Sequence, residues 1–267
     1  ARVMANRIWH HLFGAGLVRT MDNFGATGER PTHPELLDYL AVRFVESDWS
    51  VKSMIREMVL SRTYQLSSNI EAAGAAADPD NRLLWRMNHR RLGAESLRDA
   101  MLAASGRLDR QPPEGSVVTK LGDVNVGRAQ RQLGQLRRNS NQRSVYLPIL
   151  RNALPEMMRL FDAAEPSLIV GKRNETTVPT QALYLMNNPF VIGQAFNMAQ
   201  RVMDTTETRR DGIHLAYELA YAREATDDEV SKAHDFLNSV AEEKDRPGQW
   251  TVLCQSLLAS AEFRYVD

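Results

Sequence analysis

Cysteine is almost missing from this chain, and its scarcity excludes several kinds of site. Cys254 is the only cysteine among 267 residues. No disulfide can therefore form within the chain, and neither a Cys-rich zinc site nor a Cys-x-x-Cys-His haem attachment is present. We expect this chain to hold no cofactor and no metal. Because Cys254 lies among leucines in a helical pattern, we expect it to be a small core residue.

The chain also lacks an excess of charge and a long apolar run. Lys and Arg number 33, and Asp and Glu number 33 as well, so the formal net charge is zero. Proteins dedicated to nucleic acids usually carry a basic excess, so we expect no nucleic-acid partner. No apolar run reaches the roughly 18 residues that a membrane span needs. The chain opens inside a helical pattern without a signal peptide, which indicates a piece of a larger multidomain protein.

Helical periodicity dominates what is present. Apolar residues recur at helical spacing within 2–13, 36–45, 51–59, 93–105, 189–203, 208–222, 226–240 and 248–261. Two stretches, Thr32 to Glu35 and Thr226 to Glu229, have the spacing of a capping box, in which the threonine and glutamate satisfy each other's backbone N–H groups. We therefore predict an all-α, multi-helix globular domain.

The helical pattern breaks between about residues 106 and 180. Prolines at 112 and 113 and glycines at 115, 122, 127 and 134 indicate a long irregular insertion. Ser144 to Leu147 is predicted to be a short extended segment within it. We expect residues 1–267 to form a single helical domain, with 1–105 and 180–267 as candidate sub-lobes.

Adjacent histidines at positions 10 and 11 raise the question of an acid–base or metal site. Neighbours on a helix point about 100° apart, so His10 and His11 cannot face one metal. Asn6, four residues before His10, is a poor ligand. We interpret both as ordinary helix residues and apply the same interpretation to His33 at a helix start. The alternative is that one of these three histidines acts as an acid or base with a distant partner, which the sequence does not identify.

The clearest local bias in charge is a basic stretch between residues 120 and 173. It holds ten Lys or Arg residues and four Asp or Glu residues. Arginine suits carboxylate and phosphate oxygens because its N–H groups match their geometry. The candidate anion- or partner-binding residues are Arg143, Arg151, Lys172 and Arg173. A solvated basic face, a docking surface for an acidic neighbour and a site for a small anion all remain open.

Several stretches carry a resemblance to a known family. They are Asn6–Val18 (NRIWHHLFGAGLV), Asp22–Gly25, His33–Ala41, Asn81–Arg86, Arg143–Leu147 (RSVYL), Thr177–Leu183, Asn187–Phe190 (NNPF) and Ala261–Asp267. In this order and over nearly the whole chain, they resemble the planctomycete-specific domain of unknown function that lies C-terminal in large secreted proteins with cytochrome c-like domains. The resemblance supplies no established activity and no catalytic residues.

The resemblance does imply a setting. It implies an extracytoplasmic location, and partners among upstream domains of the same polypeptide, including a haem domain that would hold the haem itself. Our first hypothesis is a non-enzymatic interaction or scaffold module of such a protein. The alternative is a hydrolase or lyase acting on a sulfated or carboxylated saccharide, with arginines binding the anionic groups and His10, His11 or His33 moving the proton.

Overall fold

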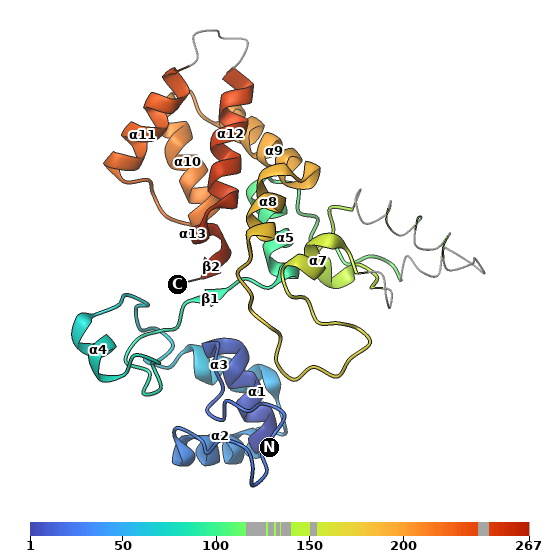
Figure 1. The fold of residues 1–267 in the computed structure, drawn as a ribbon, viewed down its shortest axis with the longest axis vertical. Helices are drawn as coiled ribbons and strands as arrows, with labels where there is room; N and C mark the ends of the chain where they lie inside the picture. Colours follow the sequence, from blue (N-terminus) through green and yellow to red (C-terminus); the bar gives the residue numbers. More distant parts are fainter. Residues whose placement is uncertain are drawn as a thin grey trace. The chain divides into compact units, whose positions relative to one another are not determined.

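The predicted all-α class is confirmed by the computed structural model, which describes residues 1–115, 127, 131, 134, 140–149, 154–239 and 246–266. These residues form α-helices and one short antiparallel pair of strands (Figure 1). The predicted irregular stretch from 106 to 180 falls partly outside them. In its described part lie a single 3-10 turn, η2 (Ser144–Tyr146), and a short helix, α7 (Glu156–Leu160). The extended segment predicted at Ser144 to Leu147 is therefore wrong.

The chain folds into two compact units. Unit 1 comprises Ala1–Arg91 together with Tyr265–Asp267, and unit 2 comprises Leu92–Arg264. The expectation of one helical domain with sub-lobes at 1–105 and 180–267 stays a prediction, because two compact units of one chain can belong to one domain. Within the described residues, no helix is both long and apolar enough to cross a membrane.

Unit 1 is built on a three-helix core. Helices α1 (Arg2–Phe13), α2 (Pro34–Glu46) and α3 (Val51–Val59) pack together, and α4 (Ala72–Ala77) follows them. Trp9 and Phe13 stack inside this core with their ring centroids 3.9 Å apart. Strand β1 (Arg90–Arg91) pairs antiparallel with β2 (Tyr265–Val266), so the last described residues of the chain complete unit 1.

A buried asparagine joins α1 to the loop that follows it. Asn6 is fully buried. Its amide nitrogen donates to the Val18 carbonyl oxygen at 3.0 Å, and its amide oxygen accepts from the Val18 backbone N–H at 2.9 Å. One side chain thereby satisfies both backbone groups of a buried residue that belongs to no helix or strand, as burial of a loop requires.

The C-terminal end of α1 is closed by residues from far along the chain. Gly14 ends the helix in the left-handed region, with φ of 82°, where glycine carries no steric penalty. The Asn88 amide donates to the Phe13 carbonyl at 2.9 Å, and the Arg90 guanidinium donates to the His11 carbonyl at 2.7 Å. These bonds satisfy carbonyl groups that a helix end leaves without partners within the helix.

Unit 2 is a helical bundle around a larger core. It contains α5 (Ala94–Ala104), α8 (Pro179–Asn187), α9 (Pro189–Thr205), α10 (Arg209–Tyr221), α11 (Asp227–Asn238), α12 (Arg246–Ala259) and α13 (Ala261–Arg264). Helix α9 packs along α12 and also contacts α5, α8 and α10 (Figure 1). Its buried apolar residues recur at helical spacing: Val191, Ala195, Met198, Ala199 and Val202. One long apolar stripe thus organises the unit.

Two sequence predictions in unit 2 are confirmed. The capping box of α11 is present, with Thr226 and Glu229 bonding to each other's backbone N–H groups. Cys254 lies on α12 in the core of unit 2 and has no exposed surface. Its burial raises the pKa of the thiol to about 12. A thiol this far from ionisation at neutral pH is a packing residue and a poor nucleophile.

Candidate functional site

The two adjacent histidines occupy the last turn of α1. Their rings are tilted by 58° and their centroids lie 5.5 Å apart. The His10 carbonyl accepts the Gly14 N–H, and the His11 carbonyl accepts from Arg90, so the backbone of both residues takes part in ending the helix. Cations are also favoured at the C-terminal end of a helix. This placement gives both histidines a structural role, and their acid–base role stays a prediction.

His33 begins α2, and this corrects the capping box predicted at Thr32. The N-cap residue is His33, and its side chain forms no cap hydrogen bond. Proline at 34 occupies the first turn, and the helix therefore starts one residue later than the Thr-x-x-Glu spacing requires. The Thr32 backbone N–H instead donates to the Leu17 carbonyl at 2.9 Å, while its hydroxyl lies 3.0 Å from the His33 ring nitrogen Nδ1.

The four predicted basic residues differ in their surroundings. Arg173 makes a bidentate pair with Glu95, with N–O distances of 2.7 and 3.0 Å, so its charge is already matched. Arg143 is exposed and lines an open hollow of about 440 Å³ beside Arg110. Lys172 is exposed as well. Neither Arg143 nor Lys172 forms an ion pair with the residues that the structure describes, and Arg151 lies outside those residues.

A candidate site for an organic ligand is a cavity of about 610 Å³ in unit 2. This volume falls within the range of about 300–1,000 Å³ that is typical of sites for small organic ligands. Among the residues that the structure describes, its apolar wall includes Leu147, Pro155, Met157, Met158, Pro189 and Phe190. The described polar side chains that line it are those of Arg98, Glu156, Tyr184, Asn188 and Gln194. We call this feature the Arg98 cavity.

Arg98 lies at a core position of α5. The buried residues of this helix include Ala94, Leu97, Met101 and Leu102, and Arg98 shares their face with only 6% of its surface exposed. Burial lowers the pKa of its guanidinium because water no longer solvates the charge fully. A buried cation needs hydrogen-bond acceptors nearby to remain tolerable.

Loop residues supply those acceptors. The Arg98 guanidinium donates to the Ser140 carbonyl at 2.6 Å, the Gln142 carbonyl at 2.9 Å and the Ser144 hydroxyl at 3.2 Å. The carboxylate of Asp99 lies 3.6 Å away, and the same oxygen accepts from the Ser144 N–H and hydroxyl. Arg98 and Asp99 together therefore hold the 140–144 loop and η2 against α5.

Tyr184 brings a hydroxyl to the same cavity from α8. Burial, with a smaller contribution from the charge of Glu156, raises the pKa of Tyr184 to about 12. The phenol therefore stays neutral at physiological pH and can donate a hydrogen bond. The Arg98 guanidinium lies over the ring of Phe190, 5.6 Å from its centroid, as in a cation–π contact. The helix α9, which carries Phe190, thus faces the charge with an aromatic surface.

The start of α9 shapes the rest of the cavity. Asn188 is the N-cap, and its side-chain oxygen accepts the Phe190 N–H at 2.9 Å, which leaves its amide nitrogen as a donor. Gly193 also lines the cavity, and a Cβ atom there would meet nothing within 4 Å. Glycine inside a helix costs about 1 kcal/mol relative to alanine, and no close packing requires it at this position.

This site was not predicted from the sequence, although one sequence signal indicates it. Arg98 falls on the i, i+3, i+4, i+7 stripe that Ala94, Leu97 and Met101 define, and a charged residue on such a stripe indicates a buried charge. The RSVYL and NNPF stretches both contribute to this site. The first supplies Ser144 and Leu147, and the second supplies Asn188, the N-cap of α9, and the ring of Phe190. Nothing local in either stretch predicts that meeting.

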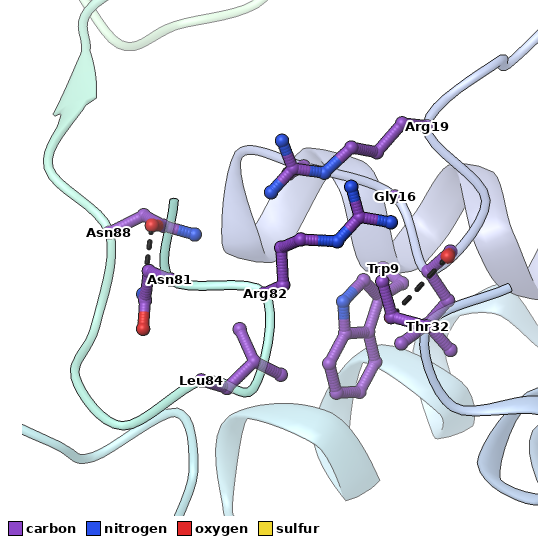
Figure 2. Close-up of a pocket in the computed structure, with 10 residues that line it drawn as sticks. Trp9, Gly16, Arg19, Thr32, Asn81, Arg82, Leu84 and Asn88 are labelled. Carbon is purple, nitrogen blue, oxygen red and sulfur yellow. Dashed lines mark hydrogen bonds between the residues drawn. The ribbon is translucent and has the colours of Figure 1, made fainter. Parts of the chain in front are cut away.

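A much smaller hollow lies in unit 1 (Figure 2). Arg19, Arg82 and Trp9 line it, and Figure 2 shows the two guanidinium groups above the indole ring. Its volume is only about 10 Å³, which is the space of roughly one water molecule. The Arg19 guanidinium donates to the Asp80 carbonyl at 3.1 Å. This hollow lies where two loops contact each other, and it is too small for an organic ligand.

The described side chains offer no cluster of metal ligands. No group of three or more His, Cys, Asp or Glu residues comes close enough to hold a metal ion in the part of the chain that the structure describes. Comparisons with curated proteins and with solved structures find no match. Residues 1–237 match the family PSD1, described as a protein of unknown function (DUF1553), and the chain therefore belongs to this family.

Proposed function

We propose that this chain is a non-enzymatic binding and interaction module of a larger extracytoplasmic protein that also carries cytochrome c-like domains. Membership of the DUF1553 family supports an uncharacterised domain, and the resemblance to the planctomycete domain supports the setting and the haem-bearing neighbours. The observation that carries the binding role is the Arg98 cavity, which combines a ligand-sized volume with a fixed cation and an apolar wall.

The polar groups of the cavity suit binding better than catalysis. A nucleophile needs an adjacent base to activate it. The Tyr184 hydroxyl, with a pKa of about 12, is a hydrogen-bond donor and a weak nucleophile at neutral pH. Arg98 is fixed by three acceptors and keeps its proton. These groups can orient a ligand and hold it, which is what a binding module requires.

Docking to a neighbouring domain is the second part of the proposal. Arg143 and Lys172 are exposed and are the two sequence-predicted residues that can meet an acidic partner without first breaking an ion pair within the described residues. Arg110, which is also exposed, lines the same open hollow as Arg143. A partner with an acidic face would associate faster and more tightly at low salt.

Ligand binding is tested with the isotope-labelled chain and a mixture of small organic fragments, both neutral and charged. We expect fragment binding to shift the backbone amide NMR signals of residues 188–194, and we expect every fragment to be recovered unchanged. Conversion of a fragment into product would contradict the non-enzymatic role. Binding elsewhere, with the signals of 188–194 unmoved, would contradict the assignment of the site.

Docking is tested by titrating the chain with a cytochrome c-like domain of the same polypeptide. The double substitution Arg143→Glu and Lys172→Glu should weaken the complex by about tenfold or more, because it places like charges in the interface. Lys52→Glu is the matched control, since Lys52 is an exposed lysine of α3 with no ion pair among the described residues. An equal effect of the control, or a complex insensitive to salt, would refute docking through these residues.

A further inference from the structure

The inference concerns the chemical class of ligand in the Arg98 cavity, and it rests on the binding role proposed above. Arg98 has five N–H groups. Three hydrogen bonds to described residues leave the remaining N–H groups for a ligand. The nearby Asp99 carboxylate does not cancel this charge fully, because its closer oxygen is 3.6 Å away and already accepts two hydrogen bonds from Ser144.

The other polar groups add donors to the same space. The Tyr184 hydroxyl stays protonated at physiological pH, and it has no acceptor among the residues that the structure describes. The Asn188 amide oxygen accepts the Phe190 N–H, which leaves the amide nitrogen as a further donor. Glu156 is the one acid among the described lining residues, and it is exposed. Donors and a cation therefore outnumber acceptors among these side chains of the described lining.

The wall of the cavity determines the rest of the ligand. Met157 and Met158 are buried and contribute flexible, polarisable side chains. The Phe190 ring offers a flat apolar surface beside the guanidinium. A hydrated inorganic ion would leave this wall in contact with water, whereas an organic body would cover it. The expected ligand thus has an anionic head and an apolar body.

We infer that the Arg98 cavity binds an organic carboxylate, with the carboxylate on Arg98 and Tyr184 and the apolar body along Met157, Met158 and Phe190. Arginine binds a carboxylate through parallel N–H···O bonds, which a neutral amide of the same shape cannot match. Gly193 lines the same space, and a Cβ atom there would meet nothing within 4 Å, so a large side chain at this position has room to occupy part of the cavity.

The probes are 4-phenylbutyrate and its uncharged amide, 4-phenylbutanamide, with binding to the full chain measured by calorimetry or ligand-observed NMR. We expect the acid to bind about tenfold more tightly than the amide, the size of one charge-assisted contact. Tyr184→Phe should weaken binding of the acid by about three- to tenfold and leave the amide less affected. Gly193→Leu should reduce binding of both probes by more than about tenfold, because the leucine fills the cavity.

The matched control is Gly248→Leu. Gly248 also lies in a helix of unit 2, a Cβ atom there also meets nothing within 4 Å, and it does not line the cavity. This variant should bind both probes as the original chain does. Thermal unfolding of every variant checks the fold, and Gly193→Leu should melt no lower than the original, because leucine favours a helix more than glycine.

The outcomes separate this inference from the proposed function. If acid and amide bind equally well and Gly193→Leu abolishes both, the cavity remains a binding site and the preference for a carboxylate is refuted. If neither probe binds at 10 mM, a concentration well above the Kd of roughly 1 mM expected for a weak fragment, the inference is overturned. If Gly193→Leu binds both probes as the original does, the cavity is not where ligands bind, and the binding role falls as well.

Discussion

Replacing the buried Asn6 by alanine tests how unit 1 holds its first loop. Asn6 has no exposed surface, and its amide makes two hydrogen bonds, at 2.9 and 3.0 Å, to the backbone N–H and carbonyl of Val18. Val18 is itself only 2% exposed. The substitution would therefore leave two buried backbone groups without a partner.

The magnitude follows from those two groups. Each buried polar group left unpaired costs about 1–3 kcal/mol, so the two together cost about 2–6 kcal/mol. Removing the amide also relieves its own burial and side-chain ordering, which offsets about 1–2 kcal/mol. We expect Asn6→Ala to lower the free energy of unfolding of unit 1 by about 1–4 kcal/mol, a large share of the stability of a small domain.

Urea unfolding followed by tryptophan fluorescence is the appropriate measurement. Trp9, Trp49 and Trp85 belong to unit 1, so three of the four tryptophans report on it. Asn69→Ala is the control, because Asn69 is exposed, and it should change stability by less than about 0.5 kcal/mol. Equal stability of the two variants would refute the argument that Asn6 supports the Val18 backbone.

Two further predictions concern an ion pair and a pair of helical glycines. Arg223 binds Glu229 with N–O distances of 2.8 and 2.9 Å and lowers the pKa of Glu229 from its ordinary 4.5 to about 2. A depressed carboxyl pKa stabilises the fold above pH 4.5, and this stabilisation is lost as the pH falls toward 2, so Glu229→Gln should lower the free energy of unfolding by about 1–2 kcal/mol at pH 7 after allowance for solvent screening. In thermal unfolding measured against pH, the difference between the variant and the original chain should vanish near pH 2. A constant difference at all pH values would contradict the charge-based account. Gly74→Ala should destabilise unit 1 by about 1–3 kcal/mol, because the new Cβ would lie 2.5 Å from the Trp85 ring. Gly193→Ala has open space around its Cβ and should stabilise unit 2 by up to about 1 kcal/mol. If calorimetry shows stability changes of the same sign for both variants, the packing argument is refuted.

Local patterns predicted the longer helices well because helices such as α2, α9 and α11 each have their own apolar stripe, whereas α4, which buries no residue, was not predicted. Helix α11 shows how far this goes, since Thr226, Glu229 and the stripe after them determine its start without help from the rest of the chain. The same spacing failed at Thr32, where proline at 34 moved the start of α2 and a contact to Leu17 took up the Thr32 N–H. A local motif predicts correctly only where no neighbour competes for the same groups.

The site was harder to predict because its residues come together only in the folded chain. Arg98 and Tyr184 lie in different helices, and the acceptors of the guanidinium come from a loop more than 40 residues after Arg98 in sequence. The excess of Lys and Arg in the basic stretch predicts a binding surface, yet composition does not reveal that Arg173 is paired with Glu95. From the sequence alone, Asn6 is only a poor metal ligand, whereas in the fold it satisfies the backbone N–H and carbonyl of Val18.

The pairing of β1 with β2 has a consequence for biosynthesis. Unit 1 uses both the start of the chain and residues 265–266, with unit 2 inserted between them. During translation the helices of unit 1 emerge first, but their small ladder lacks its second strand until the ribosome has made Val266. Unit 2 itself ends at Arg264, so the last residues of both units leave the ribosome almost together. A stop codon shortly before Tyr265 would leave β1 as an unpaired edge, open to association with other chains.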